Sequence, residues 1–224
     1  HLVTHTSGLP RVGDLDYFSR ADQPVTEAEL LAALDGVRLE FAPGTRTRYS
    51  NLAGALAGLA AGRVAGRPYR DLVTEDVLAP LQMTGTVWDP EAVADGRLAT
   101  GYGTDDDQPG HHWRMGAAEA MGGLYAPLEE IARYTAFQMD AWPARDGEQS
   151  PVAQRSSVRE SHLIAGHASP LGQTFGIGWA VVQDETLGHL VFHTGATYQY
   201  ACSVFILPRL GLGVVAMTNT GAPD

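Results

Sequence analysis

The chain has 224 residues, 44% of them hydrophobic and 18% charged, so it is long and apolar enough to bury a substantial core. Its formal net charge is −11, and such an acidic chain lacks the basic surface that nucleic acids and anionic membranes need. The single cysteine, Cys202, excludes an internal disulfide and a thiolate zinc site. The longest small apolar run, residues 52–62, is shorter than the roughly 18 residues that span a bilayer. We therefore expect no nucleic-acid partner and no membrane span.

Helix signals dominate the first part of the chain. The capping box Thr26-Glu27-Ala28-Glu29 predicts the start of a helix that Gly36 is placed to end. A second helix is predicted from the N-cap pair Ser50-Asn51 to Gly66. Pro68 opens a third predicted helix, which runs through Leu78.

Later segments alternate between irregular and helical patterns. Residues 88–123 are broken by Gly, Pro and acidic residues, which indicates an irregular surface excursion. Pro127, followed by Glu129 and Glu130, predicts the start of another helix. Residues 142–157 are polar and punctuated by Pro and Gly, which indicates an exposed loop.

Four short β-branched or aromatic runs fill the C-terminal part. Residues 175–183, 189–195, 200–207 and 212–219 are predicted strands of an antiparallel meander. Helices first and strands later favour an α+β class over alternating βαβ units. We expect helices and loops over about residues 1–170 and antiparallel strands over about 174–220.

Two short motifs could carry chemistry. In Tyr49-Ser50-Asn51, a phenol and an amide stand at the start of a helix, where they could face a cleft. In His193-Thr194-Gly195-Ala196, a glycine lies within a predicted strand, a sign of close approach by a ligand or another backbone. Each motif alone fits a structural interpretation better: an N-cap for the first and a bulged strand for the second.

Other polar segments favour structural interpretations. The opening His5-Thr6-Ser7-Gly8-Leu9-Pro10 has the composition of a loop rich in local hydrogen bonds. The pair His111-His112 lies near Asp105, Asp106 and Asp107, but adjacent histidines point in different directions, and a solvated loop is the better explanation. We predict no metal and no cofactor.

Taken together, the ordered segments resemble the serine β-lactamase-like family, which includes class C β-lactamases, D,D-peptidases and related esterases. The resemblance covers essentially the whole chain. The matching segments are, in order, Leu2–Pro10, Phe41–Gly44, Tyr49–Asn51, Pro80–Met83 with Thr86, Gly122–Leu124, His193–Gly195 and Gly213–Asn219.

The resemblance implies a β-lactamase/transpeptidase-like fold and three catalytic elements: Ser-x-x-Lys, Tyr-x-Asn and Lys/His-Thr/Ser-Gly. By this resemblance Tyr49 is the acid/base partner and Asn51 contacts a substrate amide. His193 and Thr194 steer the substrate carboxylate or the tyrosine. Gly195 and Ala196 line the substrate site, and the Ala196 N–H supplies half of the oxyanion hole.

One element of the family is absent from this sequence. All 15 basic residues are arginines, so the chain contains no Ser-x-x-Lys pair. Ser50 is interpreted as a helix cap and Ser7 as a loop serine, so neither replaces the nucleophile. Moving a phenol pKa from about 10 to 7 takes roughly 4 kcal/mol, and no ammonium group is present to supply it. We expect the interior of a longer protein, truncated at both ends and inactive as a segment.

Two functions remain open. The first is a serine hydrolase that forms an acyl-enzyme on an ester, amide or β-lactam of a small molecule or peptide. An unshifted imidazole at His193 is mostly neutral at pH 7, so it anchors an anion weakly and favours an esterase or D-peptidase over a specialised β-lactamase. The alternative is a catalytically inactive homologue that serves as a binding or scaffolding module.

Overall fold

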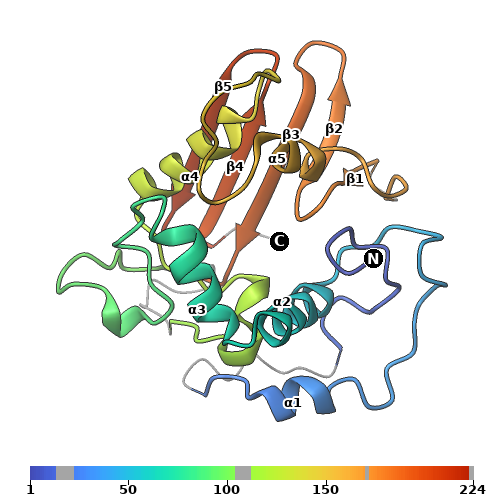
Figure 1. Cartoon of the computed structure of the whole chain (residues 1–224). Helices are drawn as coiled ribbons and strands as arrows, with labels where there is room; N and C mark the ends of the chain where they lie inside the picture. The colour runs from blue at the N-terminus through green and yellow to red at the C-terminus, as the bar shows by residue number, and fades with distance from the viewer. Residues whose placement is uncertain (14–22, 104–111, 170–171, 222–224) are drawn as a thin grey trace.

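The computed structural model describes residues 1–13, 23–103, 112–169 and 172–221. Helices precede a five-stranded antiparallel sheet, and helix α4 packs on one face of that sheet (Figure 1). The predicted α+β arrangement is therefore confirmed. No helix within these ranges is long and apolar enough to cross a membrane. The α-helices are α1 Glu27–Ala32, α2 Asn51–Ala65, α3 Tyr69–Val73, α4 Leu128–Asp140 and α5 Arg155–Ser161.

The strands form the predicted meander, because each strand pairs with the next along the chain. The first predicted strand, 175–183, is wrong in one respect: it is two strands joined by a turn. The Gly176 N–H donates to the Trp179 carbonyl at 2.9 Å, and Gly178 has a φ of 74°, which reverses the chain. The strands are β1 Thr174–Phe175, β2 Ala180–Asp184, β3 Gly188–Ala196, β4 Ala201–Leu207 and β5 Leu212–Thr218.

Helix α2 has the predicted caps at both ends. The Ser50 hydroxyl accepts the Ala53 N–H at 3.0 Å and donates to the Pro10 carbonyl at 2.7 Å. Gly66 ends the helix in the left-handed region, with a φ of 69°. The interpretation of Ser50 as a helix cap is thus confirmed, and its second bond ties the helix start to the opening loop.

Two other helices differ from prediction near their ends. The capping box of α1 is present, but the helix stops at Ala32, ahead of Gly36. Helix α3 gives way at Thr74 to a π-helical turn that ends at Leu78. After Ala32 the chain continues in i→i+3 turns as far as Gly36, which has a φ of 77°, and the π-helical turn ends at the predicted Leu78, so both differences concern the form of the last turn.

The predicted surface excursion over 88–123 is wrong for its last part. A 3₁₀ helix, Gly116–Met121, packs against α2, and Ala118 is fully buried in the core between them. Gly58 of α2 makes this contact possible, since a β-carbon there would lie 2.2 Å from the Ala120 side chain. The small residues of α2 therefore serve close helix packing.

A second core lies between the sheet and α4. It joins Val191 of β3 and Ile206 of β4 to Trp179 and Met139. Beside it, the fully buried His162 accepts the Trp142 indole N–H at its Nδ1, at 3.0 Å. The Nε2–H then donates to the Gln138 amide oxygen at 2.9 Å.

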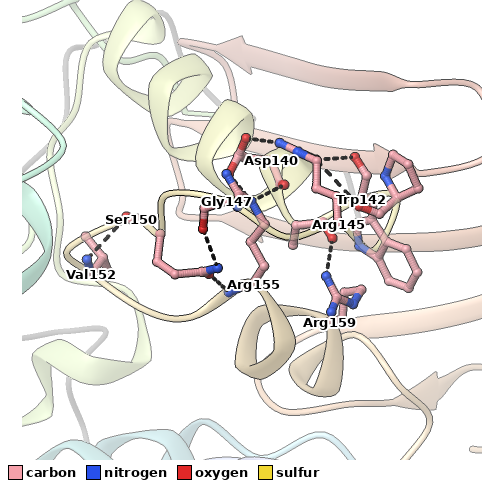
Figure 2. Close-up of polar contacts among 11 residues, drawn as sticks. Asp140, Trp142, Arg145, Gly147, Ser150, Val152, Arg155 and Arg159 are labelled. Atoms are coloured by element: carbon pink, nitrogen blue, oxygen red, sulfur yellow. Dashed lines mark hydrogen bonds and ion pairs between the residues drawn. The ribbon is translucent and has the colours of Figure 1, made fainter.

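The predicted exposed loop over 142–157 gives way to α5 at Arg155. Figure 2 shows Asp140, at the end of α4, between Arg145 and Arg155. The Arg155 Nε donates to the Asp140 carboxylate at 2.8 Å and to its carbonyl at 3.1 Å. Arg159 donates to the Ala141 carbonyl at 2.6 Å. These contacts hold the end of α4 against α5, and they account for a helix where composition predicted a loop.

Candidate functional site

The first half of the candidate site is the start of α2. Tyr49 is half-buried and directly precedes the cap, and Asn51 is the first helical residue. The Asn51 and Leu52 N–H groups both donate to the Arg11 carbonyl, at 2.8 and 3.1 Å. The opening loop therefore accepts hydrogen bonds from the free N–H groups at the start of the helix, and it fixes the position of the backbone next to Tyr49.

The second half is the C-terminal end of β3. Side chains alternate along a strand, so His193 and Gly195 lie on the same face as Val191, the face that packs on α4. Thr194 and Ala196 are exposed and alternate to the other face. The pleat therefore places the Thr194 side chain and the His193 imidazole on opposite faces. Gly195, which pairs with Cys202 on β4, has no side chain, and a β-carbon there would lie 3.1 Å from the Cys202 Sγ.

This end of β3 extends past its neighbour. The pairing with β2 ends at Ala180 and Phe192, whereas the pairing with β4 continues from His193 to Ala196. Within the described ranges no strand pairs with the other edge of 193–196. Peptide groups at such an edge can hydrogen-bond an added segment or a carbonyl oxygen.

The fold brings the two halves together. The ring centroids of Tyr49 and His193 are 6.1 Å apart, although one residue precedes α2 and the other lies on β3. Two groups that the sequence interpretation did not assign to the site also border the phenol. His5 has its ring centroid 4.4 Å from that of Tyr49, and the Arg11 guanidinium carbon lies 5.9 Å from the same centroid.

Only one of these two residues, His5 and Arg11, belongs to a recognisable sequence motif. His5 belongs to the His-Thr-Ser-Gly segment that the resemblance includes. Arg11 follows that segment and carries no motif. Its contact shows that the phenol has a cation beside it even in a chain without lysine, and a guanidinium near a ring face is attracted by the π-electrons.

His5 is buried and held in an uncommon backbone conformation. Its φ of 55° lies in the left-handed region, where histidine is more frequent than most residues. Its Nδ1 accepts the Ser50 N–H at 3.2 Å, which leaves the ring proton on Nε2 when the ring is neutral. The edge of its ring packs on Phe175 at 4.7 Å.

Both imidazoles near the phenol are neutral at pH 7. Burial lowers the pKa of His5 to about 4, and the nearby charge of a protonated His193 lowers it too. Burial also lowers the pKa of His193 below its ordinary value of 6.5. The site therefore presents uncharged imidazoles, and the Arg11 guanidinium lies near the face of the phenol ring.

The predicted absence of a metal site concerns residues that are only partly described. His111 and Asp105, Asp106 and Asp107 lie outside the described residues, and His112 stacks on Tyr200 with ring centroids 6.1 Å apart. Among the described residues, no group of three or more His, Cys, Asp or Glu side chains is arranged to hold a metal ion.

The chain, a five-stranded antiparallel sheet with helices packed on it and with its third strand ending beside a tyrosine, has the β-lactamase/transpeptidase-like fold. Comparison with known sequences gives the same assignment: the chain matches the Beta-lactamase family over residues 1–224 and belongs to it. The members of this family are serine hydrolases.

Individual relatives are distant. Protein flp of Staphylococcus aureus (strain MW2) is 25% identical over 97% of this chain and 42% of its own length. The uncharacterized protein MT1414 of Mycobacterium tuberculosis is 29% identical over 87% of this chain and 53% of its own length. The chain thus spans about half the length of the curated relatives that it matches.

Solved structures share the fold. The octameric penicillin-binding protein homologue from Pyrococcus abyssi superposes with a TM-score of 0.80 at 23% identity, over 98% of this chain and 51% of that one. A β-lactamase/D-alanine carboxypeptidase from Pseudomonas syringae gives 0.76 at 18% identity, over 100% and 67%. A class C β-lactamase gives 0.78 at 19%, over 99% and 64%.

Proposed function

We propose that this chain is the part of a serine hydrolase that carries the general acid/base and the substrate-binding strand. The observation that carries the proposal is the approach of the Tyr49 phenol to the imidazole of His193, 6.1 Å between centroids, at a strand edge with which no described strand pairs. The serine nucleophile and its lysine lie outside residues 1–224, since the chain contains no lysine. Residues 1–224 then form a partial β-lactamase-like domain and are inactive alone.

Each site residue has a proposed role in acyl transfer. Tyr49 takes the proton of the attacking serine and returns one to the leaving group. Asn51 hydrogen-bonds an amide of the substrate, and the Ala196 N–H, beside Gly195, donates to the oxyanion. His193 orients the Tyr49 phenol, and Thr194 contacts substrate from the exposed side of the strand edge.

The substrate class follows from the charge of the site. A neutral His193 holds a substrate carboxylate weakly, because it offers a hydrogen bond without a full charge. Uncharged acyl substrates, such as short-chain esters, are therefore favoured over anionic β-lactams. The full-length protein should hydrolyse a nitrophenyl ester and react slowly, if at all, with a fluorescent penicillin.

The test is Tyr49→Phe in the full-length protein. Loss of general acid–base catalysis should slow acylation by about 10²–10⁴-fold without unfolding the protein. Tyr69→Phe is the matched control, since Tyr69, on α3, is also half-buried but packs on Trp88. An unaltered rate in Tyr49→Phe removes the phenol from the mechanism.

A second measurement separates the hydrolase from an inactive homologue. The DNA upstream of the His1 codon should encode Ser-x-x-Lys. A degraded motif there, together with no activity on esters or amides, would favour a binding or scaffolding module that uses the same residues.

A further inference from the structure

Among the described residues with a ring contact to Tyr49, His5 has the nearest ring, and the proposed acyl transfer does not use it. Its centroid lies 4.4 Å from that of Tyr49, with 39° between the ring planes, against 6.1 Å for His193. On its other side His5 meets Phe175 of β1 edge-on at 4.7 Å. The imidazole is thus wedged between the phenol and the sheet, and it limits how far the phenol can tilt.

His5 also bonds the backbone on both sides of Tyr49. Its Nδ1 accepts the Ser50 N–H at 3.2 Å, and its carbonyl accepts the Arg48 N–H at 2.8 Å. The residues immediately before and after Tyr49 are therefore attached to His5, while Tyr49 itself touches the His5 ring. His5 therefore fixes both the backbone on either side of Tyr49 and the position of the Tyr49 ring.

A tight turn holds His5 in this position. The His5 N–H donates to the Leu2 carbonyl at 3.2 Å, and the Thr6 N–H donates to the His1 carbonyl at 3.0 Å. Within the turn His5 keeps a φ of 55°. Left-handed backbone at a buried side chain persists where the surroundings require it, and such positions cluster at functional sites.

Histidine suits this position better than its closest substitutes. Asparagine tolerates the left-handed region and places its Oδ1 where Nδ1 stands, but it has no ring to pack on the phenol. Phenylalanine supplies the ring without the acceptor, and it leaves the buried Ser50 N–H without its partner. Only the neutral imidazole makes both contacts.

We infer that His5 is a positioning residue for Tyr49: its ring holds the phenol beside His193, while its Nδ1 fixes the backbone at Ser50. The inference rests on the proposed function, because it gives the tyrosine the role of acid/base. Positioning matters since a misplacement of about 1 Å can cost roughly 10²-fold in rate.

Two substitutions in the full-length protein separate the ring contact from the backbone contact. His5→Asn keeps the acceptor and removes the ring, so it should lower kcat by about ten-fold with KM nearly unchanged and retain slow hydrogen exchange at the Ser50 amide. His5→Phe keeps the ring and removes the acceptor, so it should lose the exchange protection. His162→Asn is the matched control: it removes another buried imidazole, one that packs on Trp142 and Trp179, and it should lower the Tm with kcat within about two-fold of wild type.

A spectroscopic measurement tests the inference without relying on turnover. With 3-fluorotyrosine placed at position 49, the ¹⁹F signal reports the environment and the titration of that phenol alone. His5→Asn should shift its titration midpoint and its chemical shift, and His162→Asn should leave both unchanged. Wild-type kcat and wild-type fluorotyrosine titration in His5→Asn would overturn the inference. A wild-type protein inactive on every acyl substrate would overturn only the proposed function, and the ¹⁹F titration would still decide the role of His5.

Discussion

Acid should destabilise this protein through His162, and the size of the effect follows from its surroundings. The imidazole is fully buried, accepts the Trp142 indole N–H and donates to Gln138. Burial, with a smaller contribution from the charge of His189, lowers its pKa from 6.5 to about 4. A proton on Nδ1 would face the indole N–H, so the folded protein resists protonation at this ring.

The sign follows from proton uptake in the two states. Between pH 6.5 and 4 the unfolded chain binds a proton at His162 that the folded chain excludes, so the free energy of unfolding falls as the pH drops through this window. Below pH 4 both states are protonated and the effect stops growing. A difference of roughly 2.5 pH units corresponds to about 3 kcal/mol at 1.36 kcal/mol per unit. Burial lowers the pKa of His5 to about 4 as well, which adds a similar amount.

Urea denaturation at pH 7, 5.5 and 4 measures this effect. His162→Asn should lose about 3 kcal/mol less than wild type between pH 7 and pH 4, so that the two stabilities approach each other in acid. Ser50→Ala is the control, because it removes a helix cap and no titrating group, and its curve should run parallel to that of wild type. A drop in His162→Asn equal to the wild-type drop would refute the reasoning.

Three further substitutions test individual contacts by chemical denaturation at pH 7. Ser50→Ala should cost about 1–2 kcal/mol, because it removes the bonds to the Ala53 N–H and the Pro10 carbonyl; no loss would show that the cap is unimportant. Gly8→Ala should cost more than 2 kcal/mol, since its φ is 79° and a β-carbon would lie 2.2 Å from the Phe41 carbonyl oxygen. Gly66→Ala is its control, with a φ of 69° and nothing within 4 Å; it should cost only about 1 kcal/mol, and equal losses would contradict the clash. Glu130→Ala should cost about 2–3 kcal/mol, because the buried carboxylate accepts the Gly85 N–H at 2.8 Å and the Thr86 hydroxyl at 2.6 Å; a loss below 1 kcal/mol would contradict that account.

The sequence predicted the parts of the fold that depend on neighbouring residues. The capping box at Thr26, the cap at Ser50 and the left-handed Gly66 are local signals, and each has the predicted geometry. The meander was also predictable, because short apolar strands separated by turns pair with their neighbours. Local signals failed where packing decided the outcome. The segment 116–121, which composition predicted to be irregular surface, is a 3₁₀ helix that packs in the core against α2.

The candidate site divides in the same way. The residue types of Tyr49, Asn51 and His193 were recognisable from their motifs, and the sequence alone determined that no lysine accompanies them. Only the tertiary structure decided that His5 packs on the phenol and bonds the Ser50 N–H, 45 residues away in the chain. It also decided that Arg11 lies against the same ring and that burial keeps the imidazoles neutral. Such features depend on contacts between segments that are far apart in the sequence, and no local pattern of residues predicts those contacts.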